Sequence, residues 1–179
     1  MDSNNRIRIR SVSGKFKVLF SALIFIKPLS DLLYWLNFNH LPSGFDNELP
    51  VAVTEPLSIS TLIFAFLVSL IPTSVIIYML INLKKLFTLY ERGIVFTQQN
   101  VQCFRHIGLA LITLIIANLV HGALLSVVLT LNNPVGERML SLTFGSEDIS
   151  TLIMGAMIIL VSWVMNEAAS LEHEQAHTV

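Results

Sequence analysis

The chain has 179 residues, of which 54 % are hydrophobic and only 13 % are charged, and its mean hydropathy is +0.70. Soluble domains carry about 25 % charged residues, and a charge at the centre of a bilayer costs at least about 2.5 kcal/mol. The composition therefore indicates a lipid environment, and it excludes a disordered chain, an ordinary soluble enzyme and a nucleic-acid binder with a large basic surface. The net charge of −1 favours no class of partner, and the single cysteine excludes an intramolecular disulfide.

Four stretches have the roughly 20 mostly apolar residues that a transmembrane helix needs. They are expected at residues 18–38, 58–83, 107–131 and 149–165. The first is the weakest, because Lys27, Pro28 and Asp31 interrupt it. A basic segment precedes it, as in a signal peptide, but no Ala-x-Ala-like cleavage site follows, so we interpret it as a retained span. Residues 1–179 are thus expected to form one membrane domain, an all-α four-helix transmembrane bundle.

The basic residues are distributed unevenly around these spans. Five precede the first span, four lie between the second and third, none lies between the first and second, and one, Arg138, lies between the third and fourth. Lys and Arg are enriched on the cytoplasmic side of multi-pass proteins, so we expect both termini in the cytoplasm. The bilayer itself is then the first partner of the chain.

Spans two and three are predicted to continue past the bilayer. Apolar residues recur at helical spacing as far as Tyr90. Gly93 suits the left-handed residue that ends a helix, and Thr97 suits the cap of the next one. A helix over residues 58–92 would measure about 52 Å, against about 30 Å for the hydrocarbon core. Two helical ends would then project into the cytoplasm as a hairpin over residues 84–106.

The side chains of this hairpin allow two interpretations. They can hold the two helical ends together, with Phe96 and Val101 packed as a hydrophobic staple around Thr97. They can also form a docking surface for a cytoplasmic partner. The residues of that surface would be Leu86, Phe87, Tyr90, Gly93, Phe96, Thr97, Asn100, Val101, Phe104 and Arg105.

The hairpin and the tail each carry a short motif. The first is Gly93-x-x-Phe96-Thr97-x-x-Asn100-Val101-x-x-x-Arg105-x-Ile107-Gly108, and the second is Glu167-x-x-x-Leu171-Glu172-x-Glu174-Gln175-x-x-Thr178-Val179. With these motifs, its length and its four-span layout, the sequence resembles the bacterial domain-of-unknown-function 2975 family (DUF2975). His173 and His177 depart from the purely acidic tail that is usual there. The resemblance implies a bacterial cytoplasmic (inner) membrane protein without a defined catalytic residue, and a small helix-turn-helix regulator as a cytoplasmic partner.

Ionisable and amide side chains inside spans are functional hypotheses by default. Lys27 and Asp31 are four residues apart and share a helix face, and Asn118 and His121 share another. They can form an internal ion pair and interhelical hydrogen bonds, or they can relay protons or ions. Pairs of small residues also permit close helix packing or dimerisation. These pairs are Gly122 with Ser126, and Thr151 with Gly155.

The acidic tail over residues 167–179 contains His173-Glu174-Gln175-Ala176-His177, which matches the H-E-x-x-H pattern of zinc proteases. The match lies two residues from the last residue of the sequence, where no downstream segment could supply a third ligand. We therefore expect a solvated tail, with no metal site, no cofactor and no catalytic residue, in a protein that is not an enzyme.

Two functions stay open from the sequence. The first is a small regulatory or interaction protein that docks a cytoplasmic partner through the hairpin and the tail, without direct contact to nucleic acid. The alternative is a small transporter or channel subunit. It requires Lys27, Asp31, Asn118 and His121 to converge on a water-filled cavity. The sequence also leaves a homo-oligomer open.

Overall fold

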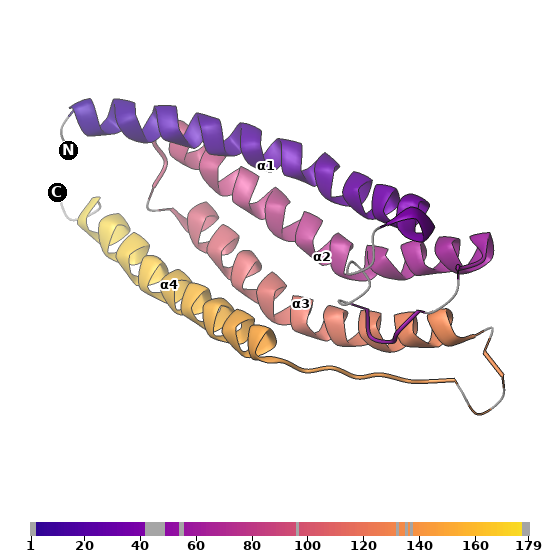
Figure 1. The fold of residues 1–179 in the computed structure, drawn as a ribbon. Coiled ribbons are helices and arrows are strands. Elements are labelled where there is room, and N and C mark those ends of the chain that lie inside the picture. Colours follow the sequence, from indigo (N-terminus) through magenta and orange to yellow (C-terminus); the bar gives the residue numbers. More distant parts are fainter. Residues whose placement is uncertain are drawn as a thin grey trace.

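The computed structural model of the protein describes residues 3–41, 49–53, 56–95, 97–131, 133–134, 136 and 138–176. Its long helices, shown in Figure 1, are α1 (Ser3–Asn37), α2 (Ile59–Glu91), α3 (Gln98–Thr130) and α4 (Ser146–Ala176). A short 3-10 helix, η1 (Phe38–His40), follows α1. The prediction of an all-α fold with four long helices is confirmed.

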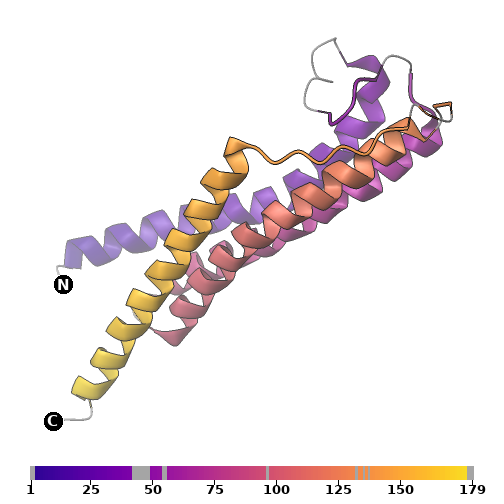
Figure 2. The ribbon, with the colours of Figure 1, turned by 90° about the horizontal axis from the view of Figure 1, so that it is seen from below.

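The helices pack in the order in which they occur in the chain. α1 lies against α2, α2 against α3 and α3 against α4, and consecutive helices run antiparallel (Figure 1). Among the described residues, α1 and α4 share no extensive contact, and Figure 2 shows α4 diverging from the other helices. The architecture is therefore an open row rather than a closed bundle. α1 begins and α4 ends at the end of the row that also carries the turn between α2 and α3.

Three of the helices are long and apolar enough to span a membrane: α2, α3 and residues 146–170 of α4. They contain the three predicted spans at 58–83, 107–131 and 149–165, apart from residues at the ends of the first two. α1 is helical through the remaining predicted span up to Asn37, but it is not among these three. That α1 also crosses the membrane stays a prediction.

The turn between α2 and α3 has the left-handed residue that was predicted at Gly93. Gly93 has φ +77°, its N–H donates to the Tyr90 carbonyl at 3.0 Å, and the N–H of Ile94 donates to the Leu89 carbonyl at 3.0 Å. This pattern closes the last turn of α2. α2 has 33 residues, and its length of about 50 Å exceeds a hydrocarbon core of about 30 Å, as predicted.

Thr97 precedes α3 as predicted, but its side chain does not cap the helix. Its hydroxyl donates instead to the side-chain oxygen of Asn100 at 2.6 Å, and the Asn100 amide donates to the Ile94 carbonyl at 3.2 Å. The fully buried Asn100 thereby ties the turn together. Phe96, and with it the predicted staple, lies outside the described residues.

α3 is joined to α4 by an extended segment, residues 138–145, that runs back along the carboxyl half of α3 (Figure 1). Two hydroxyls of α3 hold it: Thr130 Oγ1 accepts from the Met139 N–H at 3.2 Å, and Ser126 Oγ accepts from the Ser141 N–H at 2.9 Å. α4 therefore begins beside the middle of α3, and the segment covers the half that α4 does not reach.

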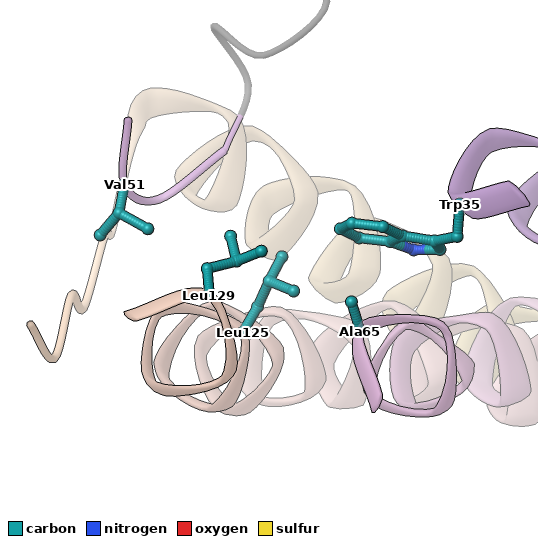
Figure 3. Close-up of a cluster of buried hydrophobic side chains, with 5 residues drawn as sticks. All are labelled: Trp35, Val51, Ala65, Leu125 and Leu129. Carbon is teal, nitrogen blue, oxygen red and sulfur yellow. The ribbon is translucent and has the colours of Figure 1, made fainter. Parts of the chain in front are cut away.

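A cluster of buried hydrophobic side chains lies at the end of the row opposite the α2–α3 turn. Its residues, drawn in Figure 3, are Trp35, Val51, Ala65, Leu125 and Leu129. The Trp35 ring lies over Ala65. α1, α2, α3 and the segment after η1 thus meet in one apolar contact.

α3 and α4 approach each other closely at two glycines, Gly108 and Gly155. A Cβ atom on Gly108 would lie 2.9 Å from the Gly155 carbonyl oxygen and 2.6 Å from Ile159 Cγ1. Gly155 was predicted as a position of close packing, whereas nothing lies within 4 Å of the corresponding position on Gly122. The backbones of α3 and α4 can therefore meet only because these two residues lack side chains.

We predict that Gly108→Ala lowers the free energy of unfolding by about 1–3 kcal/mol, because the added methyl group would overlap the backbone of α4. Gly122→Ala is the matched control on the same helix, and it should change the same quantity by less than about 1 kcal/mol. Denaturant titration of purified protein, followed by circular dichroism, measures both. Equal stability of the two variants would contradict this account of the α3–α4 contact.

Candidate functional site

The four polar residues predicted inside spans lie around one cavity. Lys27 and Asp31 of α1, and Asn118 and His121 of α3, line a cavity of about 560 Å³ between the first three helices. This volume lies within the range of about 300–1,000 Å³ that is usual for small-molecule sites. The convergence that the transporter or channel hypothesis requires is therefore present, with polar side chains from two helices that are not neighbours in the chain.

Lys27 and Asp31 form the predicted ion pair. Lys27 Nζ donates to Asp31 Oδ1 at 2.5 Å, and the other carboxylate oxygen accepts from Thr73 Oγ1 of α2 at 2.5 Å. The Asp31 side chain is 16 % exposed and the Lys27 side chain 35 %, so the ammonium is the more accessible half of the pair. One carboxylate thus joins α1 to α2 and holds a cation at the cavity wall.

A second hydrogen-bond network lies one helical turn further along α1. Trp35 Nε1 donates to Ser69 Oγ at 2.9 Å, and Ser69 Oγ donates to the Ala65 carbonyl at 2.9 Å. His121 Nε2 lies 3.3 Å from the same hydroxyl oxygen. The network joins α1, α2 and α3.

Several polar groups at the cavity can form further hydrogen bonds. Within the described part of the chain, the Asn118 side chain has no hydrogen-bond partner, and Lys27 uses one of its three protons for Asp31. In its neutral form, His121 has one donor and one acceptor ring nitrogen. The cavity thus offers an ammonium and an amide to acceptors, and a carboxylate and an imidazole nitrogen to donors.

The cavity lies toward one end of the row. Leu49 and Pro50, which precede α2, and Thr143, which precedes α4, form part of its lining. Toward the α2–α3 turn, the helices are joined by a buried apolar cluster. The members of this cluster are Leu86, Leu89, Cys103 and Ile107, with Met79 and Leu83 packed against them. Apolar packing therefore lies between the cavity and the turn.

Of the residues predicted as a docking surface, three are buried in the hairpin, four are half-buried and two are exposed. Leu86, Asn100 and Val101 are buried, and Phe87 stacks on Phe16 of α1 with 5.0 Å between ring centroids. Tyr90, Thr97 and Phe104 are half-buried, whereas Gly93 and Arg105 are exposed. These apolar side chains join α1, α2 and α3 to one another. A substitution such as Phe87→Glu would therefore disturb the packing of α1 as well as any docking.

Sequence reasoning missed Trp35, Ser69 and Thr73 as members of the site. Trp35 follows Lys27 and Asp31 at the same four-residue spacing, so the three share one helix face. Ser69 and Thr73 lie on either side of Pro72 in the apolar run of α2, where hydroxyls often compensate backbone groups. Following this face of α1 for one more turn would have identified Trp35. Ser69 and Thr73 could not be identified in this way, because their contacts depend on how α1 and α2 align.

The tail yields no site among the described residues. α4 continues to Ala176, but the side chains from residue 171 onward, including His173, and all of His177 lie outside the described set. Within that set, no group of three His, Cys, Asp or Glu side chains is placed to hold a metal.

Three long apolar helices and a polar cavity between helices indicate a multi-pass membrane protein. Residues 21–179 match the family described as protein of unknown function DUF2975, so the chain belongs to that family. No curated protein and no solved structure matches the chain.

We predict that Asp31→Leu lowers the free energy of unfolding by about 2 kcal/mol, because it leaves the Lys27 ammonium without its partner inside the protein. In the double variant Lys27→Met/Asp31→Leu most of this loss should be recovered, since two apolar side chains replace the whole pair. Thr73 loses the same acceptor in both variants, so the comparison isolates the ion pair. Denaturant titration measures the difference, and an equal loss in both variants would contradict the assignment.

Proposed function

We propose that this DUF2975 protein crosses the membrane four times, with α1 as the additional span and both termini in the cytoplasm. Nine of its eleven basic residues precede the first predicted span or lie in the hairpin, at the end of the row where α1 begins and α4 ends. The ion pair between Lys27 and Asp31 supports insertion of α1, because mutual neutralisation lowers the cost of placing either charge in the bilayer. The cavity then lies in the outer half of the membrane domain.

We propose further that the protein is a small regulatory membrane protein that binds a polar solute in this cavity. The observation that carries the proposal is the convergence of Lys27, Asp31, Asn118 and His121 on one cavity. Charged residues are rare within spans and commonly mark the path or site of a ligand or ion. A solute with both acceptor and donor groups, such as a small zwitterion, complements the adjacent ammonium and carboxylate.

Binding at the cavity can be communicated along α1. Asp31 and Trp35 attach α1 to α2 at the cavity, and Lys84 Nζ of α2 donates to Ser21 Oγ of α1 at 3.1 Å nearer the cytoplasmic end. A solute that competes for the ammonium or the carboxylate would weaken the attachment at the cavity. The apolar packing between cavity and turn favours such a signalling role over a continuous path for transport.

We predict that a cysteine at position 118 reacts rapidly with a charged, membrane-impermeant thiosulfonate added to intact cells. In a Cys103→Ala background, Asn118→Cys should react about tenfold or more faster than Ile116→Cys, because only a thiol in contact with water ionises readily. Ile116 lies on the same helix and is 61 % exposed, on a surface that would face lipid. Millimolar amino acids, as zwitterionic probes, should slow the reaction of Asn118→Cys.

Two further variants separate the outcomes of this experiment. His40→Cys, exposed after α1, should react from outside, and Gln99→Cys, exposed at the turn, should not. The reverse pattern would overturn the orientation. If His40→Cys is labelled but the cysteines at positions 118 and 116 react at equal rates, the proposal of a water-filled cavity is wrong. Uptake of the protecting amino acid into proteoliposomes would identify the transporter alternative.

As a second candidate function, we propose that the cytoplasmic turn docks a regulator protein. The favouring observation is a set of exposed polar and basic side chains around the turn, on the outside of the hairpin. They are Lys85, Arg92, Gln99, Gln102 and Arg105. A partner would therefore meet these groups rather than the buried apolar stripe, and an acidic surface would complement them.

We predict that Lys85→Glu/Arg105→Glu abolishes co-purification of such a regulator after cross-linking in cells, because two attractive charges become repulsive. Arg138→Glu, an exposed charge reversal in the segment between α3 and α4, should leave the recovery unchanged. Quantitative mass spectrometry of the cross-linked material compares the variants. If the double reversal removes no protein from the recovered set, docking at this surface is wrong.

A further inference from the structure

A second pocket, separate from the polar cavity, lies where the beginning of α1 meets the end of α2. Its volume is about 340 Å³. Arg10 of α1, Glu91 of α2 and Arg92 after α2 are among the residues that line it, and both arginines are near enough to act electrostatically on Glu91. Ile9, Tyr90 and Val95 supply apolar and aromatic surface. None of these residues belongs to the solute cavity.

The carboxylate in this pocket is already neutralised. Lys17 Nζ donates to Glu91 Oε2 at 2.6 Å, which joins α1 to the end of α2. Among the described residues, Arg10 and Arg92 have no ion pair within 4.0 Å. The two guanidinium charges are therefore not neutralised by an ion pair within the described residues.

The neighbouring positive charges affect the pKa of Glu91. Glu91 lies beyond the apolar stretch 58–83, and the hydrogen bond from Lys17 lowers the pKa of its carboxyl group. Desolvation opposes this shift, and the positive charges of Lys17, Arg10 and Arg92 add to the lowering of the pKa. All three positive charges therefore act on the one carboxylate of Glu91.

We propose that this pocket binds the phosphate of an anionic phospholipid headgroup. Two guanidinium groups match a phosphate in geometry and charge, since each can donate two parallel hydrogen bonds. The apolar part of the lining and the exposed Val12 and Phe16 on the same stretch of α1 favour a phosphate attached to an acyl chain over a free one. With both termini in the cytoplasm, the pocket lies next to the inner leaflet, where basic residues attract anionic lipids.

The test compares two double variants of the full-length protein that each remove two positive charges. Arg10→Gln/Arg92→Gln alters the pocket, whereas Lys15→Gln/Lys85→Gln removes one exposed lysine from α1 and one from α2 outside its lining. Binding of phosphatidylglycerol, phosphatidylcholine and glycerol 3-phosphate is measured by native mass spectrometry from detergent. Circular dichroism verifies that each variant is folded.

We expect the arginine variant to bind phosphatidylglycerol about tenfold or more weakly than the wild type, at roughly 1 kcal/mol for each charge removed, and the lysine variant to change by less than about threefold. Wild-type protein should bind phosphatidylcholine and glycerol 3-phosphate weakly. Equal losses in the two variants would show unspecific attraction to the basic surface and overturn the pocket. Glycerol 3-phosphate bound as tightly as the lipid would overturn the lipid headgroup as the ligand.

Discussion

The arrangement of the first three helices depends on the hydrogen bonds of one carboxylate. Asp31 accepts from Lys27 on its own helix and from Thr73 on α2, so α1 can lie beside α2 only in the register that brings these groups together. In that register Trp35 reaches Ser69, and Ser69 in turn lies beside His121. Because Lys27 lies on the same helix, other registers would keep the ion pair but lose the hydrogen bond from Thr73, and a hydrogen bond to a charged group contributes about 1.5–3 kcal/mol.

The cavity follows from this register together with the late start of α4. Because α4 begins at Ser146, its close contact with α3 is at Gly108, and an extended segment covers the rest of α3. Thr143 of that segment lines the cavity, where a longer α4 would have placed a helix. Thr130 and Ser126 satisfy two backbone N–H groups of the segment, so it can lie along α3 with these donors paired.

Hydropathy was sufficient to predict that four helices exist, but α1 begins at Ser3 and α4 continues to Ala176, well outside the apolar stretches. Local chemistry was sufficient for the turn at Gly93 and for the pairing of Lys27 with Asp31, since these depend on residues close in sequence. The α2 partners of α1 could not be predicted, because they depend on the alignment of two helices. Nor could the docking surface be evaluated, because an apolar stripe at helical spacing is the same pattern whether it meets a neighbouring helix or a partner. Only the burial of residues such as Leu86 distinguishes the two.

The two edges of the row are attached by different kinds of contact. α3 and α4 pack closely at Gly108 and Gly155, and Gln98 Nε2 of α3 donates to Asn166 Oδ1 of α4 at 2.7 Å. α1 is attached by the apolar contacts of Phe16 and Trp35 and, at intervals, by polar groups: Lys17 with Glu91, Lys84 with Ser21, and Asp31 with Thr73. Such contacts in membrane proteins contribute about 0.6 kcal/mol each on average, and solutes or headgroups offer the same hydrogen bonds in exchange. The two proposed ligands would therefore act on α1, since α1 lines both pockets and α4 lines neither.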